Sequence, residues 1–98
     1  MIYSNKEELL NCAMFCYNKL RLTSEVIITE KSLDVNGYCY EDGSIEINEE
    51  LTLNDRLLTL CHEFVHCAQY EQGATVCEEE AYRIEKELYK EYRRISYV

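Results

Sequence analysis

The residues best suited to chemistry form one short run, His-Glu-Phe-Val-His, at positions 62–66. Positions i and i+4 of a helix lie on one face, so His62 and His66 can converge on a single metal ion. Glu63 can then reach a water bound to that metal and take its proton. The spacing therefore predicts a zinc site with two histidine ligands and a glutamate base. The competing interpretation is that two ordinary polar histidines happen to share a helix face.

A catalytic zinc site needs a third protein ligand and leaves the fourth position for water. The chain has no third histidine, so the candidates are carboxylates in the run Glu78-Glu79-Glu80. At about 100° per residue, Glu79 points away from the apolar stripe of the predicted helix. Glu78 and Glu80 flank that stripe, and either can reach inward. Glu78 also has a second interpretation, as the capping-box partner of Thr75.

Cysteines stand close to these residues, and thiolate is a good zinc ligand. Cys61 and Cys67 adjoin the two histidines but face other directions on the helix, so we interpret them as core residues. Cys77 is the one cysteine that we keep as a candidate ligand. Some tyrosines could donate a hydrogen bond to a developing oxyanion, but we interpret them as packing residues and assign none a catalytic role. These are Tyr38, Tyr40, Tyr70 and Tyr82.

Three segments show apolar residues at helical spacing and can carry the site. The first helix is predicted over 4–20, with Ser4 as its N-cap. The motif helix is predicted over 54–70, and Gly73 suits the left-handed residue that follows a helix end. A last helix, which holds the candidate glutamates, is predicted over 75–95.

Between the first two helices the sequence is typical of a small sheet. Residues 25–30 are rich in β-branched side chains, and residues 44–48 alternate polar and apolar. A short strand is predicted over 38–40, and Asp42-Gly43 signals a hairpin because both residues tolerate positive φ. The predicted fold class is therefore α+β: an N-terminal helix, a small three-stranded, mostly antiparallel sheet, the HExxH helix and a C-terminal glutamate helix.

The motif and the downstream glutamates resemble those of the gluzincin metallopeptidases, in which HExxH is followed on a later helix by a glutamate ligand, often as ExxA. Here that pattern is Glu78-Glu79-Glu80-Ala81. The resemblance implies that Glu78 is the third zinc ligand, with Glu80 next. It also implies that the strand at 45–48 is the sheet edge that binds an extended peptide. It covers about residues 44–92.

Two departures from the large families stand out. Eleven residues separate His66 from Glu78, fewer than those families have. A chain of 98 residues has room for one zincin-like domain, 1–98, but not for the second lobe that usually walls the cleft. The closest likeness is therefore to the minimal, single-domain members of the group.

Composition narrows the function classes. A net charge of -9 argues against nucleic acid and anionic membranes as partners. No segment approaches the roughly 20 apolar residues that span a bilayer. The chain starts without a signal-peptide pattern, so we expect its six cysteines to be free thiols in a reducing cytoplasm. A disulfide-stapled scaffold is the alternative.

The function predicted from these residues is zinc-dependent hydrolysis of a peptide or protein substrate, with Glu63 as general base and then as acid toward the leaving amine. The alternative belongs to another class: a zinc-stabilised interaction module that keeps the metal and the metallopeptidase fold but cleaves nothing. Glu63 distinguishes the two, because hydrolysis needs it and metal binding does not.

Overall fold

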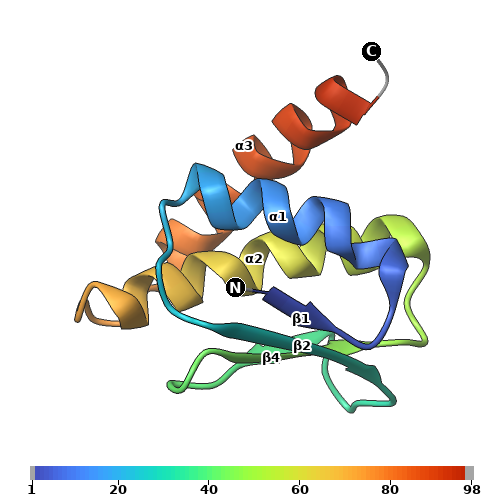
Figure 1. Ribbon diagram of the computed structural model, residues 1–98, viewed down its shortest axis with the longest axis horizontal. Helices are drawn as coiled ribbons and strands as arrows, with labels where there is room; N and C mark the ends of the chain where they lie inside the picture. Colours follow the sequence, from blue (N-terminus) through green and yellow to red (C-terminus); the bar gives the residue numbers. More distant parts are fainter. Residues whose placement is uncertain (1, 97–98) are drawn as a thin grey trace.

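The computed structural model describes residues 2–96 and places three α-helices and a four-stranded mixed sheet within them (Figure 1). The α+β prediction is confirmed, but the prediction of three mostly antiparallel strands is wrong. All three helices lie on one side of the sheet. Within residues 2–96, no helix is both long and apolar enough to cross a membrane.

The sheet has the strand order β1-β2-β4-β3. β1 pairs with β2 and β2 pairs with β4 in parallel, whereas β3 and β4 form the predicted antiparallel hairpin. The hairpin turn contains Gly43 at φ 93°, where a Cβ atom would also lie 2.7 Å from the Glu25 carbonyl oxygen. The strands are Ile2–Ser4 (β1), Val26–Lys31 (β2), Gly37–Cys39 (β3) and Ser44–Asn48 (β4).

Ser4 ends the unpredicted strand β1 rather than capping a helix. Its hydroxyl donates to the Lys6 carbonyl oxygen at 2.7 Å, and a 3-10 turn over Glu7–Leu9 leads into α1, Leu10–Lys19. Parallel neighbours need a crossover connection, and α1 provides it between β1 and β2. The first helix is therefore shorter than predicted because its start belongs to the sheet.

α2, Leu53–Glu71, is the central helix. Its N-cap is Thr52, whose hydroxyl accepts from the Asp55 amide at 3.2 Å, so the helix begins one residue before the predicted start at 54. α2 contacts both other helices as well as β3 and β4. Every residue from 60 to 69 is buried as a result, including the motif.

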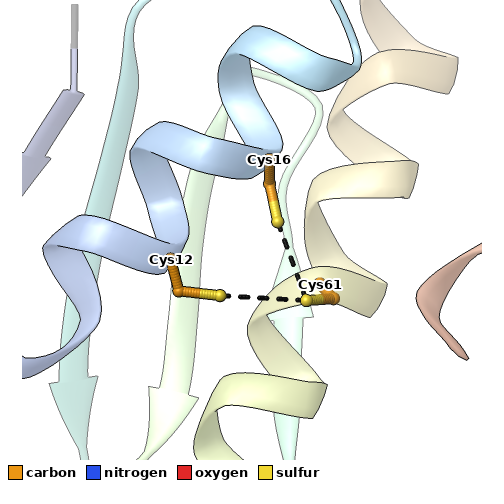
Figure 2. Close-up of side chains that lie close together, drawn as sticks. All are labelled: Cys12, Cys16 and Cys61. Carbon is orange, nitrogen blue, oxygen red and sulfur yellow. Dashed lines mark hydrogen bonds between the residues drawn. The ribbon is translucent and has the colours of Figure 1, made fainter. Parts of the chain in front are cut away.

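Cysteines fill much of the contact between α1 and α2. Cys12 and Cys16 of α1 point at Cys61 of α2, and all three side chains are completely buried (Figure 2). The six cysteines are free thiols, and Cys77 alone among them is exposed. Cys61 and Cys67 are core residues, as predicted.

Gly73 follows α2 at φ 70°, the left-handed conformation predicted for it. α3, Glu78–Ser96, then begins three residues later than expected. Thr75 therefore lies outside the helix and is not its N-cap. Glu78 becomes the first residue of α3, at the positive end of the helix dipole, where a carboxylate is stabilised.

Candidate metal centre

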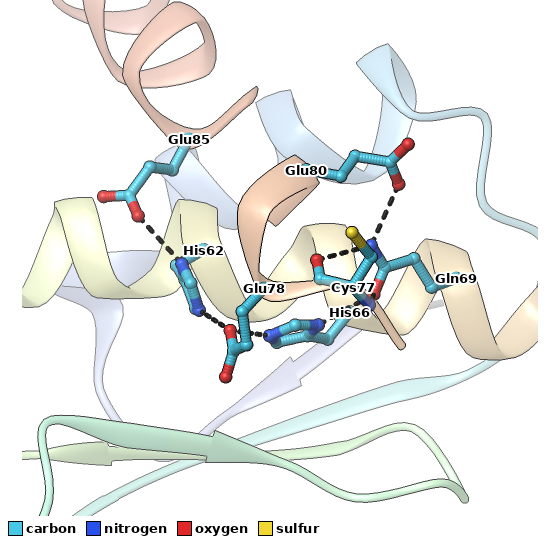
Figure 3. A network of polar contacts seen from close by, with 7 residues as sticks. All are labelled: His62, His66, Gln69, Cys77, Glu78, Glu80 and Glu85. Atoms are coloured by element: carbon cyan, nitrogen blue, oxygen red, sulfur yellow. Dashed lines mark hydrogen bonds and ion pairs between the residues drawn. The ribbon is translucent and has the colours of Figure 1, made fainter. Parts of the chain in front are cut away.

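α2 and the start of α3 bring the three predicted ligands together. The Nε2 atoms of His62 and His66 lie 2.9 Å and 2.8 Å from the same carboxylate oxygen of Glu78 (Figure 3). The two imidazoles come from successive turns of α2, and Glu78 reaches them across the helix contact. Their donor atoms all lie within 4.8 Å of one another, which is a cluster able to hold a metal ion.

A buried carboxylate fixes the orientation of the first imidazole. Nδ1 of His62 lies 2.8 Å from Oε1 of Glu85, a buried residue of α3. A carboxylate only accepts hydrogen bonds, so the Nδ1 atom of His62 carries the proton. A neutral ring with its proton on Nδ1 has its lone pair on Nε2, which is the atom that a metal ion would bind.

An amide performs the same task for the second imidazole. Nδ1 of His66 lies 2.8 Å from Oε1 of Gln69. The amide is held in this orientation because its Nε2 donates to the Cys77 carbonyl oxygen at 3.1 Å and to Glu80 at 2.9 Å. The Cys77 amide donates back to Oε1 at 3.2 Å. A neutral His66 ring with its proton on Nδ1 would therefore also have its Nε2 lone pair available to a metal ion.

Two imidazole nitrogens and a carboxylate oxygen thus meet at one place, where a cation between them would bond to all three. Two histidines and one carboxylate form a donor set that zinc accepts, and partners on the outer ring nitrogens are typical of metal sites. Ligands on tetrahedral zinc stand about 3.3 Å apart, slightly more than the distances to Glu78. The side chain of Glu78 is 64% exposed and free to withdraw by that difference.

Comparisons with known families, curated proteins and solved structures found no match for this chain. The site is therefore interpreted from its own geometry. That geometry also sorts the two candidate carboxylates: Glu78 meets both imidazoles, whereas Glu80 binds the Gln69 amide. Partial desolvation disfavours the ionised form of Glu78, but the close contacts with His66 and His62 outweigh it, so the pKa of this carboxyl group is lowered.

Glu63 lies between the ligands in sequence and is 6% exposed. Burial raises the pKa of its carboxyl group, and the neighbouring imidazoles oppose that shift. Glu63 borders a cleft of about 490 Å³ that is lined by residues of α2, α3 and β3. His62 and Glu78 line the same cleft, so the predicted base and two predicted ligands share one opening.

β3, not β4, forms the edge of the sheet beside this cleft. The order β1-β2-β4-β3 places β4 between two partners, so the prediction that residues 45–48 form the edge is wrong. The hairpin explains the difference, because β3 folds back outside β4 instead of between β4 and β2. Gly37 and Tyr38 of β3 line the cleft.

The four tyrosines differ in their relation to the cleft. Tyr82 lines it and its ring lies 4.6 Å from the His62 ring between centroids. Tyr38 lines it as well, and Tyr70 lines a smaller adjoining hollow with His66. Tyr40 donates its hydroxyl to Glu46 at 2.9 Å and is directed elsewhere.

Sequence reasoning missed Glu85 and Gln69, which hold the two imidazoles. One signal was present: Glu85 lies four residues after Ala81 and three before Leu88, a charged residue within the apolar stripe of α3. Such a buried charge calls for a partner. The candidate ligand Cys77 contributes its main chain to the network, and its thiol is outside the described donor cluster.

Proposed function

We propose that this protein is a zinc-dependent peptidase in which His62, His66 and Glu78 hold the metal and Glu63 is the general base. The observation that supports this most strongly is the shared cleft: the buried carboxylate of Glu63 borders the same opening as the donor groups of His62 and Glu78. A purely structural zinc site would not need a second carboxylate there.

When bound, zinc supplies a Lewis acid that polarises a peptide carbonyl and makes water more acidic. Glu63 accepts a proton from the attacking water and passes it to the leaving amine. Glu85 and Gln69 keep the Nδ1 protons of the imidazoles in place, which leaves both Nε2 atoms available as ligands.

A peptide is the substrate class that suits the wall of this cleft. Within residues 2–96, β3 pairs with β4 alone, so its outer edge presents unpaired backbone groups over Gly37–Cys39. An extended chain can add to such an edge as a further strand. That alignment would hold a peptide bond next to Glu63 and the metal ligands.

The test compares Glu63→Gln with the wild type, both loaded with zinc, on a mixture of unstructured peptides analysed by mass spectrometry. We expect cleavage by the wild type and at least ~100-fold less by the variant, the range attributed to a general base. Zinc content and melting temperature should be unchanged. Glu79→Gln is the matched control, because Glu79 is exposed, and it should cleave like the wild type.

Equal cleavage by wild type and Glu63→Gln would overturn the proposed role of Glu63. Zinc binding without cleavage by any variant would favour the zinc-stabilised interaction module instead. The two outcomes are separable because zinc content is measured on the same samples.

A further inference from the structure

The thiol cluster, which we define as Cys12, Cys16 and Cys61, uses a different face of α2 from the imidazoles, the face that packs against α1. Cys12 and Cys16 share one face of α1 at i and i+4, and both point at Cys61 (Figure 2). The Sγ atom of Cys61 lies 3.9 Å from that of Cys12 and 3.7 Å from that of Cys16. All three sulfurs lie within 4.8 Å of one another.

These spacings suit an ion at the centre of the cluster. Metal–sulfur bonds of about 2.3 Å in a planar three-coordinate arrangement place the sulfurs about 4.0 Å apart. The separations to Cys61 therefore need little adjustment. The other close thiol pair does not fit, because the Sγ atoms of Cys39 and Cys67 are 2.9 Å apart and leave no room for an ion between them.

We propose that the thiol cluster is a second, all-sulfur site that binds a soft, thiophilic ion in three-coordinate geometry. Thiolate ligands select soft ions. Among residues 2–96, the potential metal-binding group at this place contains these three cysteines and no fourth ligand. Their 0% exposure leaves no opening for water. Zinc fits poorly here, since it almost always takes four ligands in structural sites.

The negative charge of the three thiolates also restricts which ion the cluster can bind. Three thiolates carry three negative charges, so a monovalent ion leaves a net charge of about -2, a divalent ion about -1 and a trivalent ion none. A net charge in the core is costly. Trivalent arsenic is therefore the best-suited probe by charge, and because its three As–S bonds form a pyramid, the sulfurs must move somewhat closer together than around a planar ion. Arsenous acid and three thiols form three As–S bonds and release three waters, without any oxidation or reduction.

The ion must enter by local opening, because the cluster is closed in the folded protein. α1 has ten residues and forms the outer wall of the cluster. Partial release of so short a helix from α2 is a local event of the kind that folded proteins undergo. Binding should then raise the melting temperature, since the ion links α1 to α2 only in the folded state.

The experiment adds sodium arsenite to the reduced, full-length protein and then alkylates the remaining thiols. We expect one arsenic per chain, three sulfur ligands in X-ray absorption at the arsenic edge, and a higher melting temperature. Peptide mapping should find Cys12, Cys16 and Cys61 protected. Two-sulfur coordination, or protection of Cys39 and Cys67 instead, would overturn the proposal.

Variants separate the two groups of thiols. Cys39→Ser/Cys67→Ser should still bind arsenic through three sulfurs, whereas Cys16→Ser should lose three-sulfur coordination. Retention of that coordination in folded Cys16→Ser would contradict the proposal. Peptide mapping of the wild type decides the question if Cys16→Ser does not fold. Zinc bound through His62, His66 and Glu78 should be unaffected by arsenite, because the proposed sites share no residue.

Discussion

Two clusters of potential ligands use different faces of α2, and adjacent residues belong to different clusters. Cys61 joins the thiol cluster, and His62 joins the imidazoles and Glu78. The thiol cluster is completely buried, whereas the imidazole cluster borders a cleft of about 490 Å³. Both clusters therefore bring donor atoms close together, but the imidazole cluster borders an opening and the thiol cluster does not.

The clusters also differ in what surrounds the donors. Each imidazole has a partner on its outer nitrogen, Glu85 or Gln69, which fixes the lone pair that faces inward. In the thiol cluster, by contrast, the sulfur atoms contact one another: Cys61 contacts both Cys12 and Cys16. Oriented partners and an adjoining carboxylate are what the proposed hydrolysis would require. An enclosed group of sulfurs indicates at most the capture of an ion.

The largest expected effect follows loss of a ligand. Glu78→Ala should lower zinc affinity by more than ~100-fold, beyond the loss typical of an outer partner. The melting temperature should then stop responding to added zinc, measured by differential scanning fluorimetry. Glu80→Ala is the matched control and should bind zinc within about 10-fold of the wild type, since Glu80 acts through Gln69. The opposite result would make Glu80 the ligand.

A smaller effect is expected from the residues behind the imidazoles. Glu85→Gln should weaken zinc binding by ~10–100-fold, because His62 loses a charged acceptor on Nδ1. Competition with a chromophoric chelator measures this difference. Glu87→Gln on the exposed side of α3 should match the wild type. Wild-type affinity in Glu85→Gln would mean that the buried carboxylate serves packing alone.

The features that were predicted correctly from the sequence are those that depend on residues close together along the chain. HExxH at helical spacing located the two imidazoles and Glu63, and Gly73 marked the end of α2. Asp42-Gly43 identified the β3–β4 hairpin. Each of these depends on residues that are close together along the chain, where helix period and turn chemistry are informative.

Features that depend on contacts between distant parts of the chain could not be predicted from the sequence. β1 has three residues, too few to show a period, and its Ser4 also suits a helix cap. The parallel pairing of β2 with β4 and the edge position of β3 depend on how the chain crosses over, which alternation does not reveal. Glu85 and Gln69 acquire their roles only where α2 and α3 pack together.

Cys61→Ala provides a direct contrast with its neighbour His62. Because Cys61 is fully buried, its truncation should destabilise the fold by about 1–2 kcal/mol through the cavity that it leaves. Zinc affinity should stay unchanged. Chemical denaturation and zinc titration of the same sample measure both quantities. A large loss of zinc affinity would show that the two clusters are not independent.

The smallest effect is expected from Cys77→Ser. Its thiol is exposed and outside both described clusters, so stability should change by less than about 0.5 kcal/mol. Zinc affinity should be that of the wild type, and Cys77 should be the first thiol alkylated in the native protein. Weakened zinc binding would instead establish Cys77 as a ligand.

The most direct test of the central claim is the position of zinc in crystals of the zinc-loaded protein, located by anomalous scattering on both sides of the zinc edge. The account predicts one peak between His62, His66 and Glu78, next to the Glu63 carboxylate, and no peak between Cys12, Cys16 and Cys61. A zinc peak at the three sulfurs, or no peak at the imidazoles, would contradict it.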